Sequence, residues 1–401
     1  MKKLLILGQV PKEYGGSYTT GVANVIMEIV GHLKGEFDVY IYATNLNSGE
    51  GKKINGISLL GYSYPILVIF LIKEFLNSPI RFFRLYGEFK NKFGVIPIKN
   101  LSYLVILKHY IKKIKPDIIN AHGIMFAPIL KNLDIGRDVF YSFHGFMYDD
   151  QNSIEANKKR GLDIKKLYFN SVPWVKKAIY LTPEMKSKGE NKLKIVADKS
   201  SIISNGVNVK KFKYSSEERK KLRNRYNIDE NSKIFISVGA LTHRKNHAGF
   251  IEYLIRNNFK GHYWIIGKFE AEESKNIILN YQESVSSFEI KVINYVDHDM
   301  LYQYYSAADI YAHPSTSEGQ ALVVFEALCC GLPVMANQDI KGTVCVGREY
   351  DDSVKFVNLK TSKLLEIDNP NRKKLSQRCK EDFDWTMVAD KYKACFLNEF
   401  N

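Results

Sequence analysis

The chain has 401 residues, of which 45% are hydrophobic and 25% charged, so it has the composition of a globular protein and is long enough for two domains. Its net charge at pH 7 is +15. An odd number of cysteines, five, with one adjacent pair excludes a disulfide framework and zinc-ligand spacing, and it favours a reducing cytoplasm. The apolar run after Met1 is too short for a signal peptide, so we expect none.

The N-terminal half alternates short apolar runs with helical patterns. The first strand is expected over residues 3–8, followed by a turn at Gly15 and Gly16 and then by a helix whose apolar residues recur at helical spacing from Val22 to Leu33. Further buried strands are predicted at residues 37–43, 117–121, 139–143 and 178–181.

Residues 71–115 are strongly basic, with ten Lys or Arg against two Glu, and apolar side chains are interleaved among the charges. This mixture is typical of a segment that lies on a membrane surface. The apolar run at 64–72 is too short to span a bilayer. A core helix with solvated lysines on its outer face remains an alternative. No basic and aromatic module that reads bases is evident, so nucleic acid is not an expected partner.

The strand–helix pattern starts again in the C-terminal half. Strands are predicted at 233–238, 263–266, 290–295, 309–313 and 332–336, with a helix at 299–307. Two such arrays in tandem indicate two doubly wound domains that bind ligand at the carboxyl ends of their strands. The Lys-rich residues 186–200 are the expected linker, and an amphipathic helix is expected from residue 383 onward.

Two acids, Glu318 and Glu326, have seven residues between them and lie where a loop leads into a helix predicted at 321–330. Gly331 ends this helix as a C-cap residue. Gly319 leaves the backbone bare just before the helix, where N–H groups and the positive end of the dipole can hold an anion. Carboxylates accept hydrogen bonds from sugar hydroxyls, so a nucleotide sugar fits this arrangement.

Two cations, Arg244 and Lys245, follow the strand that ends at Gly239. At the mouth of a strand-to-helix turn, such a pair can neutralise a diphosphate leaving group as negative charge builds on it.

The stretch 313–334 resembles the Glu-x7-Glu motif of the retaining glycosyltransferases of family 4, and the flanking Pro-Ser and Glu-Ala-Leu-x-x-Gly-Leu-Pro-Val also match. The resemblance implies the α/β GT-B fold, in which two doubly wound Rossmann-like domains face a central cleft. It places an acceptor-binding domain at 1–190, a nucleotide-sugar-binding domain at 191–375, and a helix at 376–401 that packs back on the N-terminal domain.

The same resemblance assigns roles in the C-terminal domain. Glu318 would hold hydroxyls of the donor sugar, Glu326 the ribose diol, and Lys245 the diphosphate. Ala240 stands where the family usually has Arg, and Arg244 is the candidate substitute. The remaining donor-binding positions are backbone sites before and within the two turns, namely Gly239, Gly319, Gln320, Ala321 and Leu322. Gln320-Ala321 replaces the family's frequent Phe-Gly, a departure expected to affect donor-sugar preference.

In the N-terminal domain, His144 resembles the family histidine that approaches the reacting centre of the donor sugar. His122 would line the acceptor cleft, and Gly15 with Gly16 would bring the backbone close to the donor phosphate. The family typically needs no divalent metal for donor binding, so neither a metal nor another cofactor is expected.

The implied activity is retaining transfer of a hexose from a nucleoside diphosphate sugar, with UDP favoured. A Lys-, Asn- and Ile-rich composition suggests an AT-rich bacterial source. Together with the basic N-terminal domain, it predicts a lipid-linked saccharide acceptor and a peripheral location at the inner face of the cell membrane, in O-antigen, lipopolysaccharide or capsule synthesis. Two alternatives are a nucleotide-sugar 2-epimerase of the same fold and a non-catalytic scaffold of a polysaccharide complex.

Overall fold

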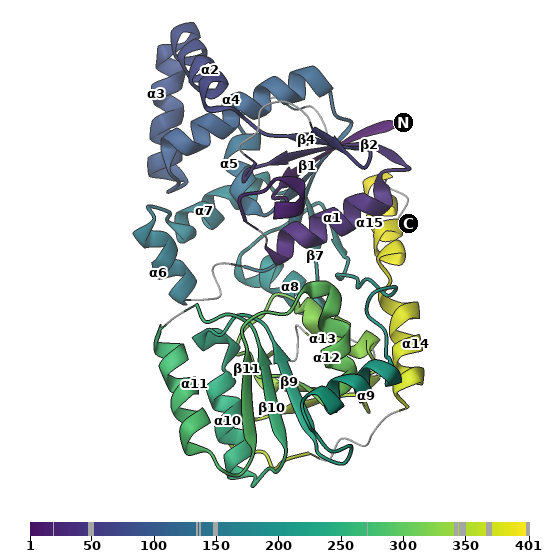
Figure 1. The fold of residues 1–401 in the computed structure, drawn as a ribbon. Helices are drawn as coiled ribbons and strands as arrows, with labels where there is room; N and C mark the ends of the chain where they lie inside the picture. Colours follow the sequence, from purple (N-terminus) through teal and green to yellow (C-terminus); the bar gives the residue numbers. More distant parts are fainter. Residues whose placement is uncertain are drawn as a thin grey trace. The chain divides into compact units, whose positions relative to one another are not determined.

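A computed structural model describes residues 1–18, 20–46, 52–133, 135, 138–146, 151–270, 272–340, 344, 350–365 and 371–397, with the backbone alone at 151–153 and 156. The chain divides into two compact units, Met1–Ser204 with Val388–Asn401, and Asn205–Met387. Each is built of helices around a largely parallel sheet, which confirms the expected α/β class (Figure 1).

In the first unit, the described residues form eight strands in the order β3-β4-β2-β1-β5-β6-β7-β8. Neighbouring strands run parallel except for β3 and β4, which are antiparallel. Their bounds are β1 Lys2–Gly8, β2 Phe37–Ala43, β3 Lys52–Ile54, β4 Ile57–Leu60, β5 Ile118–His122, β6 Asp138–Phe143, β7 Lys177–Tyr180 and β8 Lys199–Ile202.

The helices of the first unit connect these strands as crossovers. They are α1 Gly21–Leu33, α2 Tyr64–Asn77, α3 Pro79–Gly87, α4 Pro97–Ile114, α5 Ala127–Leu130, α6 Gln151–Lys159, α7 Ile164–Ser171 and α8 Pro183–Ser187. The π-helical turn η2, Glu88–Lys92, continues α3 directly.

The central strand β1 is buried on both faces, which explains its unbroken apolar run. Leu4, Leu5, Ile6 and Leu7 are all fully inaccessible to solvent. Leu5 and Leu7 pack in one core with buried side chains of α4, because alternate residues of a strand point to the same face. A strand covered by helices on both sides cannot alternate with polar residues, so the run is continuous.

The boundary between the units lies at Ser204, not at the expected residue 190. The Lys-rich segment 186–200 is not a linker, because it contains part of α8, a π-helical turn at Lys188–Lys192 and the start of β8. Strand β8 pairs in parallel with β7, with Ile202 opposite Tyr180. Backbone hydrogen bonding at the sheet edge therefore determines where the first unit ends.

The second unit has six strands among its described residues, all parallel, in the order β11-β10-β9-β12-β13-β14. The strands are β9 Ile234–Val238, β10 His262–Ile266, β11 Glu289–Ile293, β12 Ile310–His313, β13 Val334–Asn337 and β14 Val354–Val357. The helices are α9 Ser216–Arg225, α10 His247–Arg256, α11 Glu272–Ser284, α12 Leu301–Ala307, α13 Leu322–Cys329, α14 Arg372–Phe383 and α15 Trp385–Leu397.

Helix α15 begins in the second unit, and its residues from Val388 onward belong to the first. Within the first unit, the ring of Phe396 contacts Phe37 and Phe140, with ring centroids 6.3 and 5.2 Å apart. The ammonium of Lys393 lies 3.0 Å from Glu36. The expected C-terminal segment 376–401 therefore divides, because α14 packs on α13 of the second unit.

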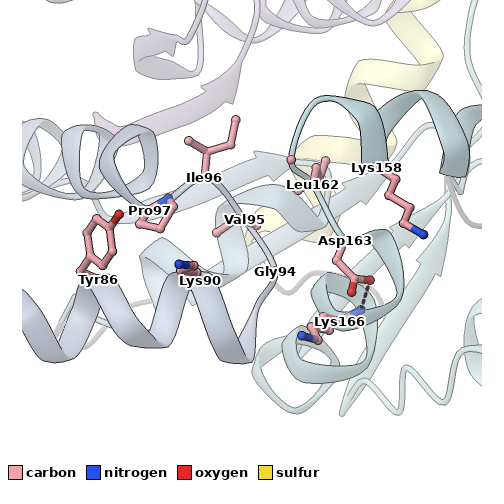
Figure 2. A pocket seen from close by; sticks show the side chains of 11 residues that line it. Tyr86, Lys90, Gly94, Val95, Ile96, Pro97, Lys158, Leu162, Asp163 and Lys166 are labelled. Atoms are coloured by element: carbon pink, nitrogen blue, oxygen red, sulfur yellow. Dashed lines mark hydrogen bonds between the residues drawn. The ribbon is translucent and has the colours of Figure 1, made fainter.

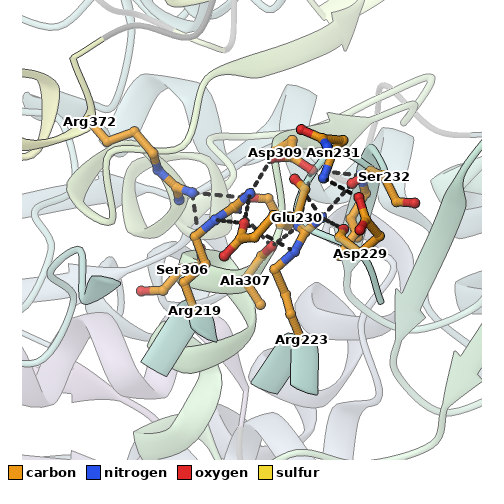
Figure 3. Close-up of polar contacts among 12 residues, drawn as sticks. Arg219, Arg223, Asp229, Glu230, Asn231, Ser232, Ser306, Ala307, Asp309 and Arg372 are labelled. Carbon is orange, nitrogen blue, oxygen red and sulfur yellow. Dashed lines mark hydrogen bonds and ion pairs between the residues drawn. The ribbon is translucent and has the colours of Figure 1, made fainter. Parts of the chain in front are cut away.

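A buried arginine cluster organises the start of β9 and the ends of two helices (Figure 3). Arg223, only 1% exposed, donates to the carbonyl oxygens of Ala307 and Asp229 at 2.8 and 2.6 Å and contacts the Asp309 carboxylate at 3.3 Å. Arg372 donates to carbonyls at the ends of α12 and α13, including Tyr305 and Cys330. A cation at helix C-termini satisfies their unpaired carbonyls, so this cluster holds α13 in place.

The strand order of both sheets reverses at a point next to the expected site residues. In the first unit the order changes between β1 and β5, and in the second between β9 and β12. Open α/β sheets bind ligands beyond the carboxyl ends of the strands at such a switch point. The first unit places the loop after β1 and His122 there, and the second places Gly239 and His313 there.

Candidate functional site

The carboxyl ends of β9 and β12 bring together residues that are about seventy positions apart in the chain. After β9, the backbone passes Gly239 and enters the short helix η7, His243–Lys245. After β12, the segment from Pro314 to Glu318 runs beside it, since Thr316 N–H donates to the Arg244 carbonyl at 3.0 Å. The basic turn and the first acid of the Glu-x7-Glu motif are therefore neighbours.

Glu318 is bound by both cations of the basic turn. Its Oε1 lies 2.6 Å from Lys245 Nζ and its Oε2 lies 2.9 Å from Arg244 Nη1. Arg244 Nη1 also donates to the Ser317 carbonyl at 2.6 Å. The Glu318 and Lys245 side chains are 9% and 15% exposed, so their contact is largely desolvated, whereas Arg244 is 41% exposed. Arg244 thus contacts the same carboxylate as Lys245, which is the position expected of a substitute for the family Arg that is absent at Ala240.

Electrostatics keep Glu318 ionised despite its burial. Burial by itself raises the pKa of this carboxyl, but Lys245, His313 and Arg244 together lower the pKa to about 2. The side chain is therefore an anion at neutral pH, and the two cations carry one charge more than it neutralises. The cluster can accept a second anion, such as a phosphate, at modest electrostatic cost.

Two buried histidines, His313 and His247, lie behind the cluster, and the sequence patterns assigned neither a role. Burial, followed by the nearby charge of Lys245, lowers the pKa of each to about 3. His313 Nε2 lies 3.6 Å from Glu318 Oε1 but makes no hydrogen bond with any described residue. The position of His313 at a strand end, directly before Pro314, was the signal that could have identified it.

Glu326 lies one turn inside α13 and is also buried. Its Oε1 accepts from His298 Nε2 at 2.9 Å and its Oε2 accepts from the Tyr305 hydroxyl at 3.2 Å. Burial, with the charge of Glu326, raises the pKa of Tyr305 well above its ordinary value, so Tyr305 is a permanent donor. His298 is half exposed and was not identified from sequence, because nothing in the pattern around it marks a site.

The loop before α13 is held by Gln320. Its Oε1 accepts from the Asn205 backbone N–H at 2.7 Å, while its Nε2 is buried without a hydrogen-bond partner among the described residues. Ala321 is the N-cap residue and Leu322 the first residue of α13, with no side chain capping the helix. The helix N-terminus next to Gly319 therefore offers uncapped amide groups, as the anion-binding prediction requires.

Gly239 is required by its conformation, with φ of +146°, and by its neighbours. A Cβ atom there would lie 3.3 Å from Lys245 Cε, and one on Gly267 would lie 1.9 Å from the Gly239 carbonyl oxygen. A side chain on Gly267 would therefore displace the Gly239 backbone, whereas one on Gly239 would be strained by its φ and would press on the Lys245 side chain.

In the first unit, the adjacent strands β5 and β6 place His122 and His144 together. His122 Nδ1 lies 2.7 Å from His144 Nε2, and the two rings are stacked at 12°. Burial lowers the pKa of His144 to about 4 and that of His122 well below its ordinary value. Both rings are neutral at pH 7, so one donates to the other. His122 Nε2 has no partner among the described residues, which leaves it able to bind a ligand hydroxyl.

The Gly15-Gly16 turn packs against the loop after β2. Gly16 lies so close to Val10 that a Cβ atom would come within 2.0 Å of the Val10 carbonyl oxygen. Asn45 holds this loop by exchanging two hydrogen bonds with the Val10 backbone, at 3.0 and 2.8 Å. The structure thus gives Gly16 a packing role in addition to the expected approach to a ligand.

No group of three or more His, Cys, Asp or Glu side chains is placed to hold a metal ion in the part of the chain that the structure describes. Four cysteines, Cys329, Cys330, Cys379 and Cys395, are free and buried, and Cys345 lies outside the described residues.

Comparison with known families agrees with this geometry. Residues 19–211 match the model of Glycosyltransferase Family 4, and residues 218–358 match that of Glycosyl transferases group 1. The sucrose-phosphate synthase structure from Thermosynechococcus elongatus superimposes with a TM-score of 0.69 at 15% identity, covering 100% of this chain and 99% of that one. The chain belongs to the family-4 glycosyltransferases of the GT-B fold.

Two curated relatives are enzymes of glycolipid or lipid-linked substrates by name. The chain is 27% identical over 292 residues to the UDP-Gal:alpha-D-GlcNAc-diphosphoundecaprenol alpha-1,3-galactosyltransferase of Escherichia coli, covering 70% of this chain and 72% of that protein. It is 22% identical over 315 residues to the alpha-monoglucosyldiacylglycerol synthase of Acholeplasma laidlawii, covering 71% and 74%. The protein is thus a glycosyltransferase, like these relatives.

Proposed function

We propose that this glycosyltransferase moves a hexose from a nucleoside diphosphate sugar, with UDP favoured, to a lipid-linked saccharide, and that the anomeric configuration is retained. The observation that carries the proposal is the cluster of Lys245 and Arg244 around the buried Glu318 carboxylate at the switch point of the second unit. The name of the Escherichia coli relative, which specifies both a UDP-sugar and a diphosphoundecaprenol acceptor, supports the donor and the acceptor class.

The donor would be held at three points of the second unit. Lys245 and Arg244 would face the diphosphate, and the uncapped start of α13 would add backbone donors to it. Glu326 would accept from the ribose diol after His298, which is half exposed, gives up its place. As the sugar leaves, negative charge builds on the diphosphate, and the excess positive charge of the cluster stabilises it.

Glu318 would serve the sugar end of the donor. When Lys245 and Arg244 turn part of their charge toward the diphosphate, the carboxylate remains ionised and can accept from sugar hydroxyls. In the first unit, the His122–His144 pair is the group proposed for sugar hydroxyls, since His122 Nε2 is unpartnered among the described residues.

The reaction is proposed to proceed without a divalent metal, because Lys245 and Arg244 supply net positive charge where a metal would otherwise neutralise the diphosphate. Activity that survives excess chelator would agree with this, and activity restored only by Mg²⁺ or Mn²⁺ would contradict it.

The role in the cell is proposed to be synthesis of a surface polysaccharide, such as an O-antigen or a capsule, by an enzyme at the inner face of the cell membrane. None of the described helices is both long and apolar enough to cross a bilayer. We propose that the enzyme attaches to the membrane peripherally and that the lipid-linked acceptor directs it there.

A thermal-shift screen over nucleoside diphosphate sugars tests the donor, because a ligand that binds only the folded state raises the melting temperature. The stabilising donor is then incubated with a polyprenyl-diphosphate-linked N-acetylhexosamine, and the product's anomeric configuration is read by NMR. Product formed from donor alone would instead indicate an epimerase. Absence of stabilisation by every donor would favour a scaffold.

A further inference from the structure

Helix α2 exposes an apolar surface that a protein in water normally buries. Seven of its fourteen residues are large hydrophobic side chains open to solvent: Tyr64, Ile66, Val68, Ile69, Ile72, Phe75 and Leu76. Its one acid, Glu74, is buried and bound by Lys108 at 2.6 Å. A contiguous apolar patch on a folded protein commonly marks a surface for a membrane or a protein partner.

Helix α3 extends this patch and packs against α2 through aromatic side chains. The two helices lie side by side at one end of the first unit (Figure 1). The Phe75 ring contacts the edges of Phe82 and Phe83, with centroids 5.5 and 5.8 Å apart. Ile80 and Phe83 are 85% and 64% exposed. The exposed side chains thus belong to one ordered helical pair, which we call the α2–α3 face.

One stripe of α3 leads from this face into a pocket. Ile80, Phe83, Tyr86 and Lys90 follow one another at intervals of three, three and four residues, so they share one side of the continuous helix α3–η2. Tyr86 and Lys90 form part of the wall of a pocket of about 410 Å³. The apolar surface and the pocket are therefore continuous.

The pocket is positively charged. Figure 2 shows Tyr86 and Lys90 on one side of it, and Lys158, Asp163 and Lys166 on the other. The Asp163 carboxylate caps α7 by accepting from the Lys166 backbone N–H at 3.1 Å. No described acid forms an ion pair with Lys90, Lys158 or Lys166. Three lysine side chains thus line the pocket, against one carboxylate that already caps a helix.

Only one of these three cations, Lys90, belongs to the basic segment 71–115. Arg81 and Lys108 contact the buried Glu74, and Lys92 lies 4.0 Å from Glu88. Lys158 and Lys166 come from α6 and α7, outside that segment. The fold thus brings Lys90 together with two lysines from outside the segment.

We propose that the α2–α3 face and its pocket dock the protein on an anionic bilayer. The apolar side chains would enter the boundary between headgroups and acyl chains, while Lys90, Lys158 and Lys166 bind a lipid headgroup phosphate. The inference deepens the proposed lipid-linked acceptor and rests on it. Apolar burial and charge attraction are the two contributions that together give stable interfacial attachment.

Charge decides between this occupant and a second copy of the chain. Two copies that met through the α2–α3 face would also bring their cationic pockets toward each other, which is unfavourable. A bilayer rich in phosphatidylglycerol presents negative charge beside an apolar interior, so it complements both parts of the surface.

Vesicle flotation with the full-length protein tests the proposal, using phosphatidylcholine vesicles with and without phosphatidylglycerol and no nucleotide sugar. The variant Lys90→Gln, Lys158→Gln, Lys166→Gln should lower partition onto anionic vesicles by about 100-fold, since each cation near the surface contributes roughly fivefold. The control Lys210→Gln, Lys213→Gln, Lys220→Gln removes the same charge from exposed positions of the second unit and should lower it by less than about tenfold.

A second variant, Ile72→Gln, Ile80→Gln, Phe83→Gln, should bind anionic vesicles more weakly than the wild type. High salt should abolish its residual binding, because only charge attraction would still hold it to the vesicle. Circular dichroism confirms that each variant folds.

The proposal would be overturned if the two lysine variants bound anionic vesicles equally well. It would also be overturned if the variant with Ile72, Ile80 and Phe83 replaced bound them as well as the wild type does. If the wild type forms a dimer but does not bind vesicles, and the variant with Ile72, Ile80 and Phe83 replaced is a monomer, the surface serves self-association instead. Stabilisation by inorganic phosphate with no vesicle binding would assign the pocket to a free anion. Because no donor is present, these failures leave the proposed sugar transfer untouched.

Discussion

Replacing Glu318 by Gln tests the electrostatic core of the candidate donor site without altering the size of the side chain. The carboxylate lies 2.6 Å from Lys245 and 2.9 Å from Arg244 and is largely buried. If these contacts stabilise the fold, their contribution must depend on the protonation of Glu318, and the glutamine variant must lack that dependence.

The magnitude follows from the pKa. That of Glu318 is about 2 in the folded chain against an ordinary value of 4.5. Each pKa unit corresponds to about 1.4 kcal/mol, so the ionised group contributes roughly 3 kcal/mol to the free energy of unfolding at pH 7. Because the folded pKa is the lower one, this contribution is present above pH 4.5 and is lost as the pH falls toward 2. About 1 kcal/mol is lost by pH 4 and about 2 kcal/mol by pH 3.

Urea unfolding followed by tryptophan fluorescence measures the effect, since Trp264 and Trp385 are buried in the second unit. The difference in unfolding free energy between wild type and Glu318→Gln should be largest near pH 7 and shrink between pH 5 and 3. Glu273→Gln, at an exposed position of α11, is the control and should show a small difference that changes little with pH. A Glu318→Gln difference that stays constant from pH 7 to pH 3 would refute the reasoning.

Three further predictions concern the same unit. Lys245→Ala and Arg244→Ala should each lower the turnover number more than donor affinity, because their charge matters most as the diphosphate leaves; steady-state kinetics that show full activity in Arg244→Ala would remove its role. Glu326→Ala should weaken binding of the free nucleoside diphosphate by about 1.5–3 kcal/mol in calorimetry, and unchanged affinity in a folded variant would contradict the ribose contact. Arg223→Met should lower the free energy of unfolding by roughly 1–3 kcal/mol, because the buried carbonyl oxygens of Ala307 and Asp229 lose their donor, while Asp309 keeps its contact with Arg219. Arg225→Met, at an exposed position of the same helix, should change it by less than about 0.5 kcal/mol, and equal losses in the two variants would show that burial of Arg223 is not the cause.

Much of the fold was predictable because the information is local. The apolar run of β1 and the helical spacing of α1 each reflect a neighbourhood of a few residues, and the structure places both elements within a residue or two of the predicted positions. The Glu-x7-Glu stretch was equally legible, since the glycine at its start and the C-cap at its end are local signals.

The linker prediction failed for the opposite reason. Lysines at 186–200 look like a solvated connection, but the backbone of Lys199–Ile202 pairs with β7. Edge strands satisfy their hydrogen bonds on one side only and can carry polar side chains, so composition did not reveal β8.

What the sequence determined by itself was the type of each site residue and the order of the elements that carry it. Only the tertiary structure decided which of them meet: Glu318 with Lys245 and Arg244, Glu326 with His298, His122 with His144, and the lysines of the pocket. The first three contacts each join segments about twenty or more residues apart, and the pocket joins Lys90 to Lys158 and Lys166 of later helices. Their proximity depends on which strands are neighbours in the sheet and where the strand order reverses, and this is settled by packing of the whole unit.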